Sequence, residues 1–86
     1  MARALTMRRS IVPLADRKKF LQKLKSRQKY FVGAGCKFWV FEESDLTGAF
    51  VEFIEADDPK TLAKALADAS EQPAEAVRIY EEVDVD

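Results

Sequence analysis

Two kinds of hydrophobic periodicity alternate along this chain, and their order is the feature that most restricts its fold. Residues 4–12 (ALTMRRSIV) alternate apolar and polar side chains, as a half-buried strand does. After Pro13, apolar side chains recur at helical spacing from Asp16, a suitable N-cap, to about Phe31. The stretch Gly33-Ala34-Gly35 is expected to end this helix as a C-cap.

The middle of the chain is typical of a β-hairpin. Residues 36–43 (CKFWVFEE) are rich in aromatic and β-branched side chains, which favour strands. Residues 44–48 form a turn that ends in glycine, and residues 49–55 (AFVEFIE) return as the second strand.

A second helix and a last strand complete the pattern. Asp57-Asp58-Pro59 combines an N-cap aspartate with proline at the first helical position, and Gln72-Pro73 is expected to break the helix. Residues 77–83 (VRIYEEV) alternate again. The order strand-helix-strand-strand-helix-strand predicts an α+β, ferredoxin-like βαββαβ fold. Its right-handed crossovers give a four-stranded antiparallel sheet with two helices on one face. A chain of 86 residues supports one such domain, residues 1–86.

The composition removes several kinds of chemistry. The chain has no histidine, which is the commonest general base and metal ligand, and one cysteine, Cys36. We therefore expect no metal and no cofactor, and no residue stands out as catalytic. The N-terminal residues lack an apolar signal core, and no apolar run is long enough to span a membrane. The expectation is a cytoplasmic protein without membrane contact.

Charge is divided sharply along the chain. Residues 1–40 carry eleven Lys and Arg against one acidic residue, whereas residues 41–86 carry three against fourteen. The formal charges of the two parts are therefore +10 and −11. We expect the two parts to neutralise each other, within the fold or across a subunit interface. A face that binds a polyanion is the alternative.

The sheet face away from the helices is where we expect function. In each strand we assign the more apolar set of alternate residues to the core, and the other set then lies on that face. The residues assigned to the core are Leu5, Met7, Ile11, Cys36, Phe38, Val40, Val51, Phe53, Val77 and Ile79. The residues predicted there to contact a ligand are Arg8, Trp39, Phe50, Glu52, Arg78 and Tyr80. Phe41 and Ile54 would enlarge the apolar patch, which monomers seldom expose. We therefore expect a homodimer through this face. Arg8 and Glu52 could instead form a simple cross-strand ion pair.

Residues 48–53 (GAFVEF) resemble the second half of the RNA-recognition octapeptide, in which Phe50 would stack on a base. Three positions depart from that motif. Gly48 stands in place of its other stacking aromatic, Thr47 in place of a glycine, and Leu46 in place of a Lys or Arg. The predicted face also carries negative charge, which disfavours phosphate. We therefore expect no binding of nucleic acid, and an RNA-recognition-like single-strand binder is the lesser alternative.

The pattern of the whole chain resembles the dimeric α/β-barrel superfamily, which includes antibiotic-biosynthesis-type monooxygenases and many uncharacterised proteins. The resemblance implies two sheets packed face to face, with a ligand pocket between them. It also implies binding, or oxygenation without a metal, of a small aromatic molecule. The rival interpretation is a non-catalytic homo-oligomeric assembly module. Unpaired Arg or Glu side chains in the pocket would favour an enzyme, and a fully packed interface would favour the module.

Overall fold

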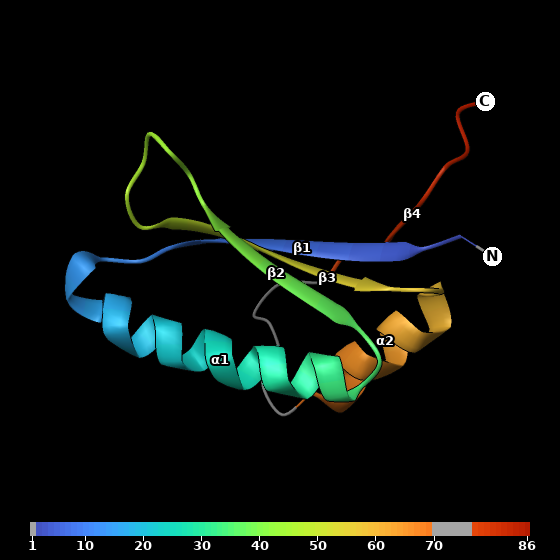
Figure 1. The fold of residues 1–86 in the computed structure, drawn as a ribbon, viewed down its shortest axis with the longest axis horizontal. Coiled ribbons are helices and arrows are strands. Elements are labelled where there is room, and N and C mark those ends of the chain that lie inside the picture. The colour runs from blue at the N-terminus through green and yellow to red at the C-terminus, as the bar shows by residue number, and fades with distance from the viewer. Residues whose placement is uncertain (1, 70–76) are drawn as a thin grey trace.

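The computed structural model describes residues 2–69 and 77–86 and has the predicted order of elements (Figure 1). A short 3-10 turn, η1, precedes the first helix. In chain order the elements are β1 (Ala4–Ile11), η1 (Leu14–Asp16), α1 (Arg17–Gly33), β2 (Lys37–Glu42), β3 (Ala49–Ala56), α2 (Pro59–Asp68) and β4 (Tyr80–Glu81). In the described residues, neither helix has the length and apolar character needed to cross a membrane.

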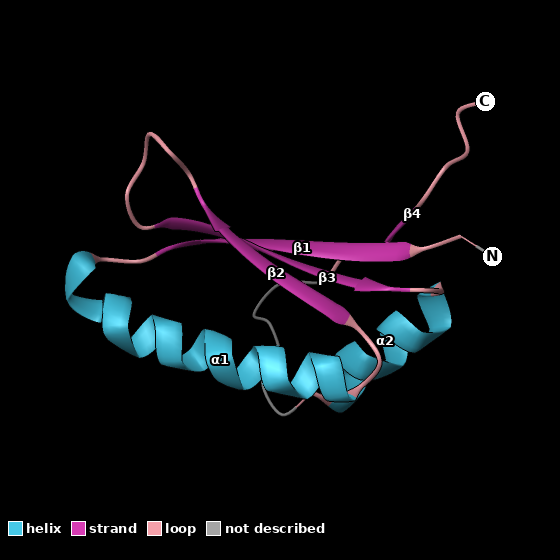
Figure 2. Cartoon of the chain, in the orientation of Figure 1, coloured by secondary structure: helices cyan, strands magenta, loops and turns pink. Residues whose placement is uncertain are grey.

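The four strands form one antiparallel sheet in the order β2-β3-β1-β4. The two longest strands, β1 and β3, lie at its centre and pair along their full length. Both helices lie on the same side of the sheet, so the molecule has two layers (Figures 1 and 2). This is the ferredoxin-like fold predicted from the sequence.

The helix signals were correct at two of the three predicted helix ends that lie in the described residues. The Asp58 carboxylate accepts hydrogen bonds from the backbone N–H of Thr61 at 2.8 Å and from its hydroxyl at 2.9 Å, and Pro59 follows. At the end of α1, Gly35 has φ +86°, and the N–H of Cys36 donates to the Phe31 carbonyl at 2.9 Å. Asp16 makes no capping bond, because it ends the 3-10 turn with helical backbone angles.

The last strand is shorter than predicted. Sequence alternation suggested residues 77–83, but β4 pairs only at Tyr80 and Glu81, opposite Leu5 and Ala4. Just before it, the Arg78 carbonyl accepts a hydrogen bond from the buried Thr6 hydroxyl at 2.7 Å. The predicted helix break at Gln72-Pro73 lies outside the described residues.

The core lies between the helices and the central strands. It joins Leu24 and Phe31 of α1 to Leu62 of α2 and to Phe38 and Ile54 of the sheet. The rings of Phe31 and Phe38 stack with centroids 6.1 Å apart. The apolar stripes of both amphipathic helices are buried here, which accounts for their positions over one sheet face.

The hairpin between β2 and β3 depends on Gly48. This residue has φ +92°, and its carbonyl accepts the Val12 N–H at 2.8 Å. Its own N–H donates to Glu42 Oε2 at 2.8 Å. Gly48 therefore links the end of β2 to the residue that follows β1, and it does so in a backbone conformation that favours glycine.

Replacing Gly48 with alanine should lower the free energy of unfolding by about 1–3 kcal/mol. The new Cβ would lie 2.5 Å from the Val12 carbonyl oxygen, in addition to the unfavourable φ. Gly33→Ala is the matched control, because a Cβ there has no neighbour within 4 Å, and it should leave stability unchanged or raise it. Urea unfolding of the two variants checks this, and equal midpoints would contradict it.

Candidate binding face

The register of the strands decides which side chains share a face of the sheet. Phe38, Ile54 and Thr6 lie opposite one another on three neighbouring strands. Phe38 and Ile54 belong to the core, so this row faces the helices. Two residues farther along β3, Glu52 must face the helices too, and so must Phe50.

The predicted assignment of alternate side chains to the two sheet faces was therefore correct for β2 and wrong for β1 and β3. Phe50 and Glu52 were expected on the open side, but they are 3% and 2% exposed beneath the helices. Met7 and Phe53, predicted in the core, lie on the side away from the helices. The physical reason is that both sheet faces are apolar, so hydrophobicity alone did not distinguish them.

Glu52 is a buried carboxylate held by α1. Its Oε1 accepts a hydrogen bond from Arg27 Nη1 at 2.7 Å, and the two side chains are 3% and 12% exposed. Its Oε2 has no hydrogen-bond partner in the described part of the chain. Arg8 lies directly opposite Glu52 in the register, yet it is exposed, and the carboxylate pairs with Arg27 instead. The predicted Arg8–Glu52 ion pair is therefore wrong.

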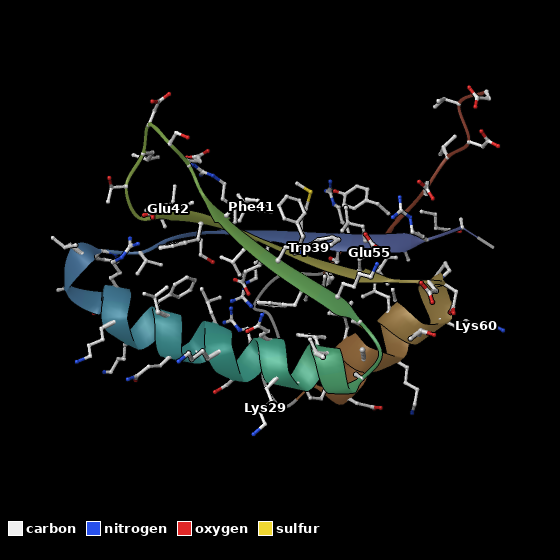
Figure 3. All side chains as sticks on the ribbon, in the orientation of Figure 1. Lys29, Trp39, Phe41, Glu42, Glu55 and Lys60 are labelled. Carbon is white, nitrogen blue, oxygen red and sulfur yellow. The ribbon has the colours of Figure 1, made fainter. Side chains whose placement is uncertain are left out.

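The sheet surface away from the helices, which we call the open face, is mostly apolar. One row crosses three strands as Trp39, Phe53 and Met7. Figure 3 shows Trp39 and Phe41 projecting from β2 on the side opposite the helices. The open face consists of Leu5, Met7, Arg9 and Ile11 of β1, Lys37, Trp39 and Phe41 of β2, Val51, Phe53 and Glu55 of β3, and Tyr80 of β4.

Ion pairs neutralise most of the charge at the margins of the open face. Arg9 Nη2 lies 3.0 Å from Glu43 Oε2. Arg3 lies 3.5 Å from Glu55 and 2.8 Å from Glu82. The hydrogen bond from Arg3 holds the pKa of Glu82 below its usual value. The face is thus an apolar surface bordered by paired charges, suited to contact an apolar partner or ligand.

The structure brings together only some of the predicted ligand-binding residues. Trp39 and Tyr80 lie on the open face, 43% and 46% exposed. Phe50, Glu52 and Arg8 belong to the helix side.

Arg78 precedes β4, and it contributes its carbonyl to the bond with Thr6. The open-face residues that sequence reasoning missed are Leu5, Met7, Arg9, Ile11, Val51, Phe53 and Glu55. The position of the predicted turn was enough to place Phe53 on the correct face. A hairpin centred on residue 46 places Trp39 opposite Phe53, so the two must share a face.

Neither thiol chemistry nor a metal cluster is indicated. Cys36 is buried, and burial raises the pKa of its thiol. Within residues 2–69 and 77–86, no three His, Cys, Asp or Glu side chains gather in a metal-binding arrangement.

Fold and face together define a class: a small ferredoxin-like α+β domain with an apolar sheet face left open. Among solved structures, the chain is similar to a conserved protein from Methanosarcina mazei Go1, with TM-score 0.73 and 16% identity over 95% of this chain and 92% of that one. It is also similar to Rv0793 from Mycobacterium tuberculosis, with TM-score 0.62 and 16% identity over 100% and 97%. No protein-family model and no curated protein matches the chain. At this identity the likeness establishes the fold alone.

Acid should weaken the fold through Glu42. Its two oxygens accept hydrogen bonds from Arg17 at 2.7 and 3.0 Å, and Arg17 and the Gly48 N–H lower its pKa from 4.5 to about 2. The stabilisation is complete above pH 4.5 and is lost as pH falls toward about 2. Urea midpoints between pH 5 and pH 2.5 should therefore fall more steeply for the wild type than for Glu42→Gln. Glu81→Gln, at an exposed position, is the control and should follow the wild type.

Proposed function

We propose that this protein is a homodimer in which the open faces of two copies pack together and enclose a site for a small apolar or aromatic molecule. The observation that carries the proposal is the continuous Trp39–Phe53–Met7 row and its exposed apolar neighbours. This is the arrangement expected of the dimeric α/β-barrel superfamily, which the chain resembles in its element order.

The size of the apolar patch supports pairing. Met7, Trp39 and Phe41 are 51%, 43% and 60% exposed, and Ile11 and Tyr80 are 61% and 46% exposed. With about 150–250 Å² per large side chain, these five expose on the order of 500 Å² in each copy. Burying ~1,000 Å² in two copies at ~25 cal/mol per Å² gives about 25 kcal/mol, which exceeds the ~4–15 kcal/mol entropic cost of association.

The chemistry of the enclosed site favours binding over catalysis. Arg9 and Glu55 are the charged groups nearest to the aromatic row on the central strands, and both are already in ion pairs. Such compensated charges orient a polar group of a ligand but leave no free base. The ligand class is therefore a flat, mostly apolar molecule that stacks against Trp39 and contacts Met7. A dimer without a ligand, serving as an assembly module, is the second candidate, because the same row could fill the interface.

The RNA-binding alternative depended on Phe50 being exposed for stacking on a base. Phe50 is 3% exposed and packs against Phe20 with ring centroids 5.0 Å apart. A base cannot reach that ring without opening the core, so Phe50 does not support nucleic-acid stacking.

Replacing Phe41 with glutamate should convert the dimer to a monomer. Two symmetry-related charges would enter the apolar interface, whereas in the free monomer the side chain at position 41 faces solvent. Leu14→Glu is the control, because Leu14 is 79% exposed and lies outside the sheet. Light scattering at micromolar concentration reports the mass. A wild-type protein that runs as a compact monomer would disprove the dimer.

Ligand binding can be followed through Trp39, the single tryptophan of the chain. Titration with 2-naphthol, a flat phenol, should change Trp39 fluorescence with saturation. Met7→Glu should abolish the response, because it places a charge in the same row, and Leu14→Glu should retain it. A dimer that shows no saturable response would leave the assembly module as the function.

A further inference from the structure

Helix α1 presents an exposed positive surface that the rest of the described chain does not neutralise. The helix contains no Asp or Glu. Its five lysines are all exposed, and none forms an ion pair with an acidic side chain among residues 2–69 and 77–86. Because the whole chain has a net charge of −1, this positive charge is a local feature of α1. The five are Lys18, Lys19, Lys23, Lys25 and Lys29.

Two apolar side chains lie among these lysines. Five exposed residues of α1 follow one another at intervals of three or four and therefore form one stripe along the helix. This lysine stripe consists of Lys18, Leu21, Lys25, Lys29 and Val32. Leu21 is 42% exposed and Val32 is 58% exposed, whereas Leu24 and Phe31 lie on the side of α1 that packs into the core. Figure 3 shows Lys29 pointing away from the sheet. The stripe thus combines positive charge with exposed aliphatic side chains.

This combination matches the surface of an anionic lipid bilayer. The bilayer offers negative headgroups to lysine and, just below them, a hydrocarbon boundary that receives aliphatic side chains. Lysine suits this boundary because its long stem lies along apolar groups while its ammonium group stays with the headgroups. Nucleic acid offers no such apolar layer, and the stripe has neither an arginine to read base edges nor an aromatic side chain to stack on them.

The lysine stripe is accessible whatever the oligomeric state. With a rise of about 1.5 Å per residue, the stripe from Lys18 to Val32 is about 21 Å long, enough to lie along a flat surface. Both helices lie on one side of the sheet, opposite the open face (Figures 1 and 2). Pairing through the open face therefore leaves α1 of each copy on the outside, so the stripe does not depend on the proposed function.

We propose that α1 docks this protein on membranes that contain anionic lipid, with the helix axis parallel to the bilayer. The three lysines of the stripe contact the headgroups, and Leu21 and Val32 enter the boundary below them. The expectation of no membrane contact rested on the lack of a signal core and of a spanning segment. A helix that lies on the membrane surface needs neither.

Sedimentation with lipid vesicles tests the docking. The wild type should bind vesicles of phosphatidylcholine and phosphatidylserine in equal parts, and it should not bind vesicles of phosphatidylcholine alone. Sodium chloride at about 0.5 M should release it, because salt screens the attraction. Each lysine near an anionic surface strengthens binding about fivefold, so Lys25→Gln combined with Lys29→Gln should weaken it about 25-fold.

The matched control removes two lysines from α2. Lys60→Gln combined with Lys64→Gln changes the net charge equally and should weaken vesicle binding far less. The reason is that these lysines already lie beside acidic residues: Asp57 and Asp58 precede Lys60, and Lys64 Nζ lies 3.1 Å from Asp68 Oδ2. Equal losses from the two double variants would mean that net charge alone governs binding, and would overturn the docking through α1.

The apolar contact separates a membrane from other polyanions. Val32→Gln should weaken binding to the mixed vesicles about threefold or more, because its burial in the bilayer is lost. Ala63→Gln, which places the same side chain at an exposed position of α2, should bind as the wild type does. A wild type that does not bind the mixed vesicles would overturn the proposal. So would a wild type that binds polydeoxythymidine more tightly than the vesicles, because the stripe would then be a nucleic-acid surface.

Discussion

The pairing of β1 with β3 is the constraint on which the rest of the structure depends. Eight residues of each strand lie opposite one another, from Ala4 with Ala56 to Ile11 with Ala49. This register places Thr6 beside Ile54 under the helices and Met7 beside Phe53 on the open face. A shift of β1 by one residue would turn its side chains to the opposite faces, burying Met7 and exposing Thr6. The composition of the open face is thus set by backbone hydrogen bonds in the middle of the sheet.

Arginine and lysine have separate roles in this chain. Arg3, Arg9, Arg17 and Arg27 each pair with a glutamate from the second half of the sequence. Arg17 reaches the carboxylate of Glu42 with two nitrogens, as its planar guanidinium permits. The lysines of α1 make no such pairs with described residues and give the helix an exposed positive surface. The ion pairs between the two halves are therefore formed by arginine, and the lysines of α1 lie outside them.

Local patterns predicted the elements, and non-local contacts decided the faces. Asp58-Pro59 and Gly35 mark helix ends because a cap or a positive φ involves only neighbouring residues. The length of β4 was overestimated, because only Tyr80 and Glu81 pair with β1, although β1 continues to Ile11. Glu52 was assigned to the open face because Val51 and Phe53 were predicted, as the more apolar residues of this strand, to face the core. Its partner Arg27 lies on another element, 25 residues away in the sequence.

What the sequence by itself determined is the order of strands and helices, the ferredoxin-like plan, and the presence of more large apolar side chains than one core can hold. These follow from periodicity and composition, which are properties of neighbouring residues. Only the tertiary structure decided that Trp39 lies with Phe53 and Met7 and that Phe50 lies under α1. With apolar side chains in both phases of β3, hydrophobicity does not select a face. The selection comes from the strand register together with the one face that the two helices cover.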